Sequence, residues 1–312
     1  MGQGCKFHRG DRVGNFGVEA FSMRRSYYFF AISISTICLM ENKTANRFHN
    51  FEHEGWQKAA SQYGAGFGGV TMQSVGPLLN AVGVRDGIRL LDVACGPGYV
   101  ASAAERQGCA AVGIDFSSSM IEVAKVANPA IEFREGDAQN LDFPNSCFDA
   151  VVMNFGMLHL AEPDKAIAEA YRVLRSGGRY AFTVWDSPPK AAGFEIVLGA
   201  VRMHGNIDVP LPEGPPFFRF SDPLECARAL KIAGFADVET IIVPQVWMLE
   251  SGGMLFETMR RAAVRTAALL NLQTPEALVN IEKEISTRAE GYRLQGRIEL
   301  PMPAILTSAV KR

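Results

Sequence analysis

The sequence predicts an α/β protein built on a doubly wound, largely parallel β-sheet. Short apolar runs of strand length alternate with helical segments of about ten residues, a pattern typical of right-handed βαβ units. These runs are apolar along their whole length, as expected for strands buried on both faces. Several of them end in a polar side chain, and ligands of such sheets bind beyond the carboxyl ends of the strands.

The individual elements follow from this alternation. Strands are predicted over residues 88–94, 109–115, 131–135, 148–154 and 179–185, and helices over 99–107, 117–126 and 163–174. Ser117 is expected to cap its helix, and Gly177-Gly178 to stop the last one. Further upstream, the Gly-rich stretch 64–69 separates two helical segments, around 56–63 and 71–82.

Composition excludes several classes of protein. The 312 residues are 48% hydrophobic and 21% charged, which is ordinary for a folded globular chain and rules out wholesale disorder. A net charge of -2 gives no basic field, so a nucleic-acid partner is not expected. The six cysteines are scattered without a CxxC pair, which favours reduced thiols in the cytoplasm over disulfides or a metal site.

The first 40 residues stand apart from this pattern. The uncharged run 26–40 is shorter than the roughly 20 residues that span a bilayer, and no small-x-small cleavage site follows it. Residues 1–40 are therefore expected to be a disordered or spurious extension, with no stable membrane insertion. A loose membrane or partner anchor and a secretory signal are the alternatives.

A glycine-rich turn after the first strand is the strongest local sign of a ligand site. The run Asp92–Gly98 opens a helix, where glycines allow close approach and free N–H groups face a ligand. Asp115 ends the next strand, within reach of ribose hydroxyls. Because residues 96–101 also satisfy the GxGxxA form of the dinucleotide fingerprint, an NAD(P)-dependent oxidoreductase is one alternative. Asp92, however, would repel a pyrophosphate, and no Tyr-x-x-x-Lys pair is present.

Four runs together resemble the class I S-adenosylmethionine-dependent methyltransferases, in particular the ubiquinone and menaquinone C-methyltransferase branch. They are LLDVACGPGYVA, VGIDFSSSMIEVA, FREGDAQNLDFPNSCFDAVVMNFGMLHL and EAYRVLRSGGRYAFTVW. The resemblance covers about residues 56–186 and implies a Rossmann-like, seven-stranded mixed sheet whose last strand is antiparallel. Residues 238–246 and 298–310 are the candidates for strands six and seven, although Pro301 and Pro303 remove ladder donors from the latter.

The same resemblance implies roles for single residues toward the cofactor S-adenosylmethionine. Asp92 and the loop residues Ala94, Cys95, Gly96 and Gly98 would hold its methionine part, and Asp115 its ribose. Phe116 and Met120 would pack near the adenine, Asp137 and Ala138 would contact its edge, and Asn154 and Phe155 would lie beneath the sulfonium.

Candidates for other roles follow from position. Tyr63, before the Gly-rich stretch, is expected to close over the cofactor unless it is a core aromatic. His159 is the first candidate general base, with packing after strand four as its alternative role, and Asp186 is the second.

The predicted function is in-line methyl transfer from S-adenosylmethionine to a small hydrophobic or aromatic molecule. The expected division is 41–84 covering the cofactor, 85–250 as core, 251–292 as an inserted two-helix substrate lid, and 293–312 as the last core strand. A Pro- and Phe-rich loop, 208–220, belongs to the substrate side. Besides the oxidoreductase, a non-catalytic S-adenosylmethionine-binding protein is an alternative. The methylated atom and the oligomeric state have no signature in the sequence.

Overall fold

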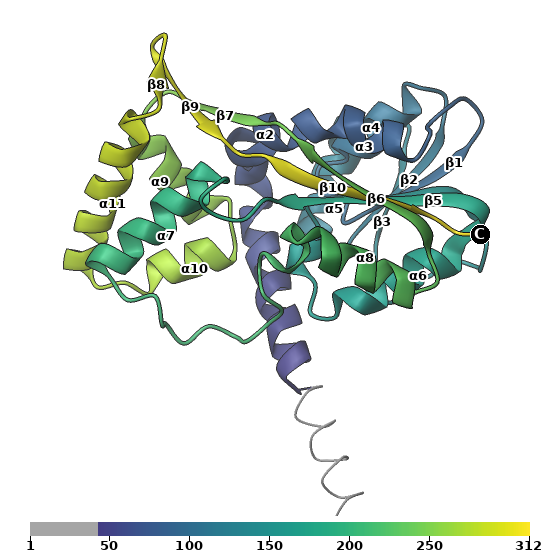
Figure 1. Cartoon of the computed structure of the whole chain (residues 1–312), viewed down its shortest axis with the longest axis horizontal. Helices are drawn as coiled ribbons and strands as arrows, with labels where there is room; N and C mark the ends of the chain where they lie inside the picture. Colours follow the sequence, from purple (N-terminus) through teal and green to yellow (C-terminus); the bar gives the residue numbers. More distant parts are fainter. Residues whose placement is uncertain (1–42) are drawn as a thin grey trace, which may run out of the picture. The chain divides into compact units, whose positions relative to one another are not determined.

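A computed structural model describes residues 43–312, and its centre is a seven-stranded mixed sheet (Figure 1). The strand order is β3-β2-β1-β4-β5-β10-β6, with β10 antiparallel to both of its neighbours. These strands are β1 (Arg89–Val93), β2 (Ala110–Asp115), β3 (Glu132–Glu135), β4 (Phe148–Asn154), β5 (Leu174–Trp185), β6 (Ala236–Val243) and β10 (Ala304–Val310). The predicted fold class is confirmed, including the antiparallel last strand.

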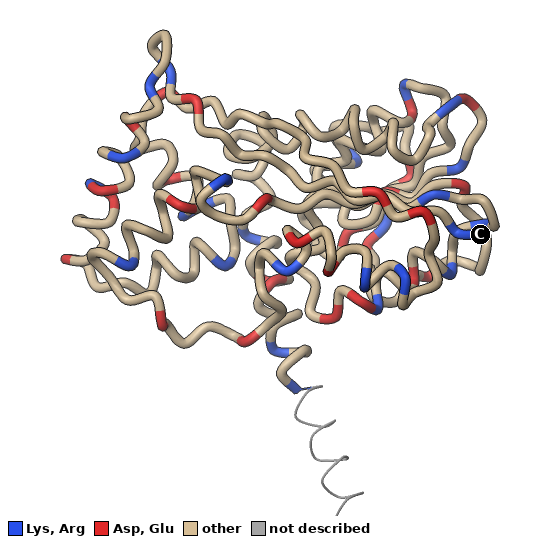
Figure 2. The backbone as a smooth tube through the Cα atoms, in the orientation of Figure 1, with Lys and Arg blue, Asp and Glu red and all other residues tan. Residues whose placement is uncertain are grey.

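Helices cover the sheet, and α4, α5 and α6 begin at or within one residue of the predicted positions. The α-helices after residue 63 are α2 (Gly69–Thr71), α3 (Val75–Ala81), α4 (Tyr99–Glu105), α5 (Ser118–Ala127), α6 (Pro163–Val173), α7 (Ala192–His204), α8 (Pro223–Ile232), α9 (Gly252–Arg261), α10 (Arg265–Asn271) and α11 (Pro275–Glu290). The Ser117 hydroxyl caps α5 by accepting from the Met120 amide. Charges of both signs are found along α6, α8 and α11 (Figure 2), which is typical of solvated helix faces.

The Gly-rich stretch is helical, so the predicted break between two helices is wrong. Residues 43–63 are helical, and the chain continues through a π-helical turn, η1 (Gly64–Gly68), into α2, η2 (Met72–Ser74) and α3. Glycine at this turn allows another segment to pack closely against it. A Cβ on Gly66 would lie 2.7 Å from Thr258 Cγ2 and 2.9 Å from Ala262 Cβ, and Trp247 Nε1 donates to the Gly66 carbonyl at 3.1 Å.

The predicted seventh strand, 298–310, is two strands in two different sheets. β9 (Arg297–Pro301) lies between β7 (Val246–Leu249) and β8 (Arg293–Leu294) in a three-stranded sheet, whereas β10 joins the core. Proline at 301 and 303 removes the donors that a continuous ladder would need. The predicted sixth strand, 238–246, likewise ends at Val243, and β7 begins at Val246.

The predicted two-helix lid is larger than expected. Three helices, α9, α10 and α11, follow β7, and α7 from the core half of the chain packs against α11. We call α7, α9, α10, α11 and the three-stranded sheet the cap. The apolar stripe of α9 is core, with Leu255, Phe256 and Met259 buried, so it does not line a binding surface.

The predictions for residues 1–40 fall outside the described residues. Within 43–312, none of the helices has both the length and the apolar character needed to cross a bilayer. No group of His, Cys, Asp and Glu side chains in that range is arranged to hold a metal ion.

Candidate functional site

A cavity of about 1020 Å³, counting its open mouth, lies beyond the carboxyl ends of the central strands. Core, cap and helix 43–63 all contribute to its walls. The structure brings eleven of the predicted site residues to this cavity: Tyr63, Ala94, Gly96, Asp115, Phe116, Met120, Asp137, Ala138, Asn154, Phe155 and His159. Four others, Asp92, Cys95, Gly98 and Asp186, do not line it.

Asp115 organises the glycine-rich turn. Its Oδ2 accepts from the Gly96 amide at 2.8 Å, and its Oδ1 accepts from the Ser117 amide at 2.9 Å. Ala94 adopts φ +54° and Gly96 φ +50°, the left-handed region that favours glycine, so Ala94 holds a conformation that residues with a Cβ rarely adopt. Burial raises the pKa of Asp115 to about 6, so a cationic ligand would stabilise its ionised form.

Asp92 lies beneath this turn, fully buried behind the cavity wall. Its Oδ2 accepts from the Ala101 amide at 2.9 Å, whereas its Oδ1 has no hydrogen-bond partner among the described residues. Burial raises the pKa of Asp92 to about 8, with the nearby Asp115 carboxylate adding to the shift. An unpartnered buried carboxylate oxygen next to a second carboxylate suits a ligand that carries positive charge.

Cys95 and Gly98 have structural surroundings. Cys95 is buried with Ala101 and Phe133, and burial raises the pKa of its thiol well above the usual range. Gly98 has φ +82°, and a Cβ there would lie 2.6 Å from Phe133 Cζ. Both residues therefore shape the turn from below.

Asp186 is buried outside the cavity. Its Oδ1 accepts from the Ser187 amide at 2.7 Å, and its Oδ2 lies 3.1 Å from Lys190 Nζ. This pairing leaves Asp186 poorly placed to take a proton from a ligand in the cavity, whereas His159 lines it.

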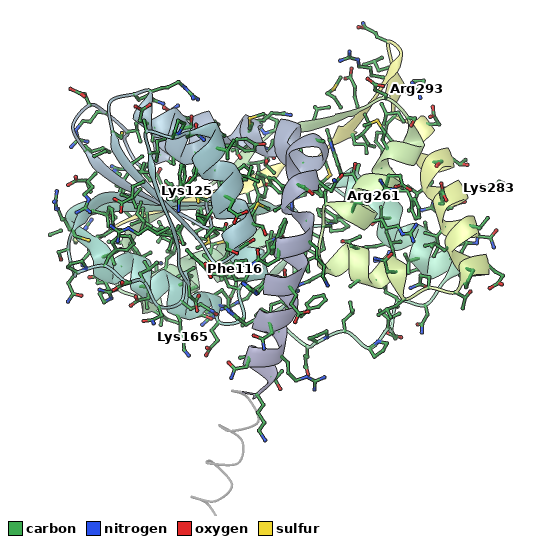
Figure 3. All side chains as sticks on the ribbon, turned by 180° about the vertical axis from the view of Figure 1, so that it is seen from behind. Phe116, Lys125, Lys165, Arg261, Lys283 and Arg293 are labelled. Atoms are coloured by element: carbon green, nitrogen blue, oxygen red, sulfur yellow. The ribbon has the colours of Figure 1, made fainter. Side chains whose placement is uncertain are left out.

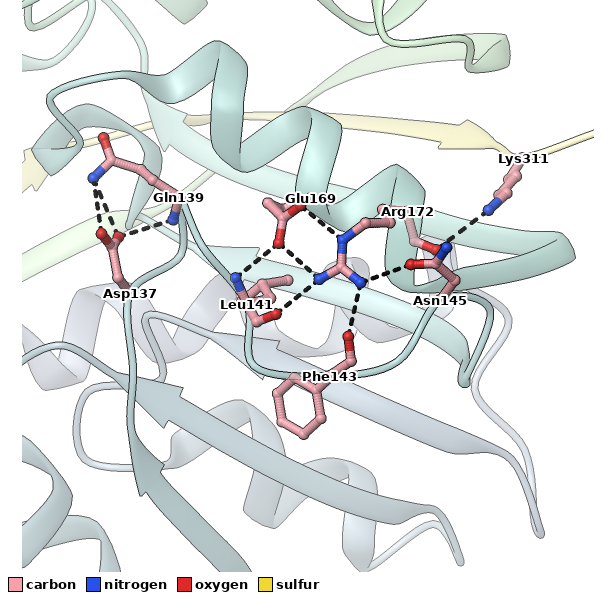
Figure 4. Close-up of polar contacts among 8 residues, drawn as sticks. All are labelled: Asp137, Gln139, Leu141, Phe143, Asn145, Glu169, Arg172 and Lys311. Carbon is pink, nitrogen blue, oxygen red and sulfur yellow. Dashed lines mark hydrogen bonds and ion pairs between the residues drawn. The ribbon is translucent and has the colours of Figure 1, made fainter.

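The Asp137 turn is held from outside the cavity (Figure 4). Asp137 Oδ1 accepts from the Gln139 amide at 2.8 Å. Farther along the same loop, Arg172 of α6 donates to the carbonyls of Leu141 and Phe143, each at 2.7 Å, and pairs with Glu169. One arginine thus fixes the loop that follows the turn.

The side chain of Asn154 is fully engaged by the protein. Its Oδ1 accepts from Ser74 at 2.8 Å and from Thr183 at 2.6 Å, and its Nδ2 donates to the Thr71 carbonyl at 3.1 Å. The next residue, Phe155, has φ +57° and stacks on Trp185 with ring centroids 4.1 Å apart. A non-glycine residue in this conformation at a cavity wall is a frequent feature of functional sites.

Aromatic residues from helix 43–63 cover the adjacent wall. Phe116, labelled in Figure 3 beside that helix, packs edge-on against His49 and His53, with ring centroids 5.7 Å and 5.5 Å away. Tyr63 donates its hydroxyl to Thr71 Oγ1 at 3.3 Å, and burial raises its pKa to about 12, so the phenol stays protonated at neutral pH.

His159 has a buried partner that the sequence did not reveal. Its Nδ1 lies 2.9 Å from Glu52 Oε2, and Arg265 Nε lies 2.9 Å from the other oxygen, Glu52 Oε1. Glu52 is fully buried, and Trp56 packs edge-on against the His159 ring at 4.8 Å.

Several further aromatic wall residues were not predicted: Trp56, Phe67, Trp185, Phe194 and Phe217. Only Phe217 lies in a segment that the sequence assigned to the substrate side. The cap reaches the cavity through Phe194 of α7 and through residues 262–266, which join α9 to α10 and include the first two residues of α10.

The doubly wound sheet and the acidic residues at its strand ends are typical of α/β proteins that bind a nucleoside, and comparison with known proteins identifies the family. A family model described as a methyltransferase domain matches residues 91–182. The demethylmenaquinone methyltransferase of Clavibacter sepedonicus is 35% identical over 171 residues, covering 51% of this chain and 70% of that protein. That of Renibacterium salmoninarum is 40% identical over 111 residues, covering 36% and 47%, so this match spans about half of the relative.

A solved structure shares the fold. Phosphoethanolamine N-methyltransferase 2 of Haemonchus contortus, in complex with phosphomonomethylethanolamine and S-adenosylhomocysteine, has a TM-score of 0.52 and 20% identity, covering 85% of this chain and 60% of that one. The chain belongs to the class I S-adenosylmethionine-dependent methyltransferases, in the branch of the demethylmenaquinone enzymes. S-adenosylmethionine is the family's cofactor, and the oxidoreductase alternative is not favoured.

Proposed function

We propose that this protein methylates a neutral, hydroxyl-bearing aromatic molecule of the quinol type. The observation that carries the proposal is the cavity, in which a carboxylate-bearing wall meets an aromatic wall at Phe155 and Trp185. The names of the curated relatives point to the same substrate class.

The charges of the cavity support a neutral substrate. Arg265 is the single Lys or Arg among the described lining residues, and it is committed to Glu52 Oε1 and to the carbonyls of Pro215 and Leu158. A phosphate or carboxylate on the substrate would therefore find no unpaired guanidinium or ammonium group in that lining. An aromatic ring, by contrast, would find Phe155, Trp185 and Phe194.

We assign to these residues the roles that the resemblance implies. Asp115, Asp137 and the turn from Ala94 to Gly98 would hold the cofactor, with Asp92 supplying charge from beneath. When bound, S-adenosylmethionine would supply an activated methyl group for transfer to the substrate nucleophile, with the electron pair of the broken carbon–sulfur bond staying on sulfur. The protein aligns the two molecules and excludes water, and such alignment is worth about 7–11 kcal/mol of barrier. His159 would accept the hydroxyl proton.

We also propose how the chain is divided and where it acts. The cofactor half would consist of residues 41–84 and 85–250. The lid would consist of residues 251–292, together with α7 and β9, and the rest of 293–312 would form the closing strand. A cytoplasmic location is supported by the free thiols of Cys95, Cys109, Cys147 and Cys226.

The test is methyl transfer from isotope-labelled S-adenosylmethionine to a reduced naphthoquinol that lacks the ring methyl group. We expect labelled product with the wild type, and none when an apolar naphthalene without hydroxyl groups replaces the quinol. Calorimetric binding of S-adenosylmethionine without turnover of any quinol would contradict the substrate class. Absence of binding would contradict the cofactor site itself.

A further inference from the structure

Glu52 joins two parts of the molecule that are far apart in sequence. It lies on helix 43–63, is 0% exposed, and receives one hydrogen bond from His159 and one from Arg265, on different oxygens. His159 follows β4 in the core, whereas Arg265 opens α10 in the cap. A buried carboxylate in this position is costly unless both oxygens are satisfied, and here both are.

The charges of the three groups balance without a proton on the imidazole. Arg265 is a permanent cation, so it compensates the Glu52 carboxylate, and the guanidinium is also fixed by the Pro215 carbonyl at 2.8 Å and stacked over Phe48 at 4.3 Å. His159 can consequently remain neutral. A neutral imidazole beside a carboxylate oxygen is the donor, so its proton belongs on Nδ1.

The other ring nitrogen is then an acceptor. Nε2 of His159 makes no hydrogen bond to the described residues, and the ring lines the cavity between Trp56 and Phe217, which pack edge-on at centroid distances of 4.8 Å and 6.3 Å. Neither aromatic ring competes for the lone pair of this nitrogen. The remaining partner for Nε2 is a hydroxyl group in the cavity.

We propose that Glu52 is a positioning residue that fixes His159 in the Nδ1–H tautomer, so that Nε2 can accept the proton of the substrate hydroxyl. The step moves one proton from the substrate oxygen to Nε2, leaving the electron pair on the substrate. Arg265 supports this step by compensating the negative charge of the Glu52 carboxylate. Because Arg265 belongs to the cap segment 262–266, the arrangement requires that segment to be in place. The identity of the proton donor rests on the proposed function. The tautomer of His159 does not depend on it.

The substitution Glu52→Gln tests this arrangement because an amide has one acceptor where a carboxylate has two. Arg265 can only donate, so the amide oxygen must serve Arg265 Nε, and the amide NH₂ group then faces His159 Nδ1. The imidazole must then accept this hydrogen bond at Nδ1, so its own proton moves to Nε2. The variant thus keeps the size of the side chain and reverses the tautomer.

The first measurement is the tautomer itself, from long-range ¹H–¹⁵N spectra of protein labelled at histidine, in mildly alkaline buffer where an unperturbed imidazole is neutral. His159→Asn assigns the signal. We expect protonated Nδ1 in the wild type and protonated Nε2 in Glu52→Gln. Glu54→Gln is the matched control, because Glu54 is exposed on the same helix, and it should retain the wild-type pattern.

A double variant separates positioning from folding. In Glu52→Gln with Arg265→Met, the amide oxygen is free to turn toward His159, so the Nδ1–H tautomer should return. Protonated Nε2 in the wild type overturns the proposal even if Glu52→Gln does not fold. An unchanged tautomer in Glu52→Gln, or no reversal in the double variant, also overturns it.

The second measurement is turnover of the naphthoquinol. Glu52→Gln is expected to lower kcat by about 10²–10³-fold, the usual contribution of a general base, while KM and the affinity for S-adenosylmethionine change less than about threefold. If the wild type turns over no quinol, the proposed function fails while the tautomer result stands. If the tautomer reverses and kcat does not fall, the proton-transfer role is excluded.

Discussion

The two sides of the cavity are built in different ways. On the sheet side, made by the turns at the ends of β1, β2 and β3, carboxylates accept from backbone amides of these same turns, as Asp115 does from Gly96 and Ser117. On the cap side, made by Phe194, Phe217 and residues 262–266, the walls are aromatic or small and come from distant segments. The cap side is anchored by Arg265 to a helix 213 residues away. Backbone geometry therefore sets one side, and tertiary packing sets the other.

The largest effect is expected from a substitution on the sheet side of the cavity. Asp115→Ala leaves the amides of Gly96 and Ser117 without their acceptor and removes the predicted ribose contact. We expect at least about a 100-fold loss of affinity for S-adenosylmethionine, measured by calorimetry. Asp142→Ala, which removes an exposed carboxylate, should bind as the wild type does. Wild-type affinity in Asp115→Ala would contradict the assignment.

The buried Asp92 predicts an unusual pH dependence. Its pKa is raised from 3.8 to about 8 in the folded protein, so between these values the folded state holds a proton that the unfolded state releases. The free energy of unfolding contributed by Asp92 therefore falls as pH rises from about 4 to 8, by up to about 1.4 kcal/mol per pH unit.

Urea unfolding of cofactor-free protein at several pH values measures this slope. Asp92→Asn cannot titrate, so the difference between wild type and variant should shift in favour of the variant as pH rises. Saturating S-adenosylmethionine should flatten the difference, since positive charge favours the carboxylate. Parallel pH curves would show that burial does not raise the pKa of this group.

Gly66→Ala sharpens the contrast from the cap side. The added Cβ would meet Thr258 and Ala262, pushing α9 away from the π-helical turn. We expect a loss of about 1–3 kcal/mol in stability and a raised KM for the quinol, with little change in cofactor affinity. Gly69→Ala is the control, because its Cβ would meet nothing within 4 Å. Equal effects of both substitutions on thermal unfolding and KM would contradict this packing argument.

The smallest effect is expected from the loop beyond Asp137. Arg172→Gln removes the donors to the Leu141 and Phe143 carbonyls and should cost about 1–2 kcal/mol of stability, with a modest loss of cofactor affinity. Arg228→Gln breaks an exposed pair with Glu225 and should cost less stability than Arg172→Gln. Thermal unfolding and calorimetry of the two variants test the comparison, and a larger cost at Arg228 would refute it.

The sheet side could be predicted from the sequence because its geometry is local. The Ala94–Gly98 turn, Asp115 and Asp137 each lie at or just after the end of a strand, so the strand pattern alone predicts that they share one edge of the sheet. The fold class followed from the same alternation of strands and helices, and the structure confirms it. Candidates chosen by proximity alone were less reliable, since Asp186 follows β5 and yet does not line the cavity and pairs with Lys190.

The cap side could not be predicted in this way. Glu52 lies 107 residues from His159, and nothing in the composition of either segment pairs them. Pro301 and Pro303 indicated an interruption of the last strand, but they did not indicate that β9 would join a second sheet. The Gly-rich stretch was predicted to separate two helices, whereas its Gly66 accommodates Thr258 and Ala262 at the end of α9.

The division of strands between two sheets also governs how the cavity can open. Short connections join the cap to the core at the ends of β5, β6 and β10, all on one side of the sheet, and the remaining connection, 205–222, is mostly loop. On the opposite side the cap meets helix 43–63 through Arg265 and Val264. A movement of the cap away from that helix would therefore break these contacts and leave the pairing of the core strands intact. Amide hydrogen exchange at residues 262–266 would report this motion, and its slowing would mark the moment when both reactants are enclosed.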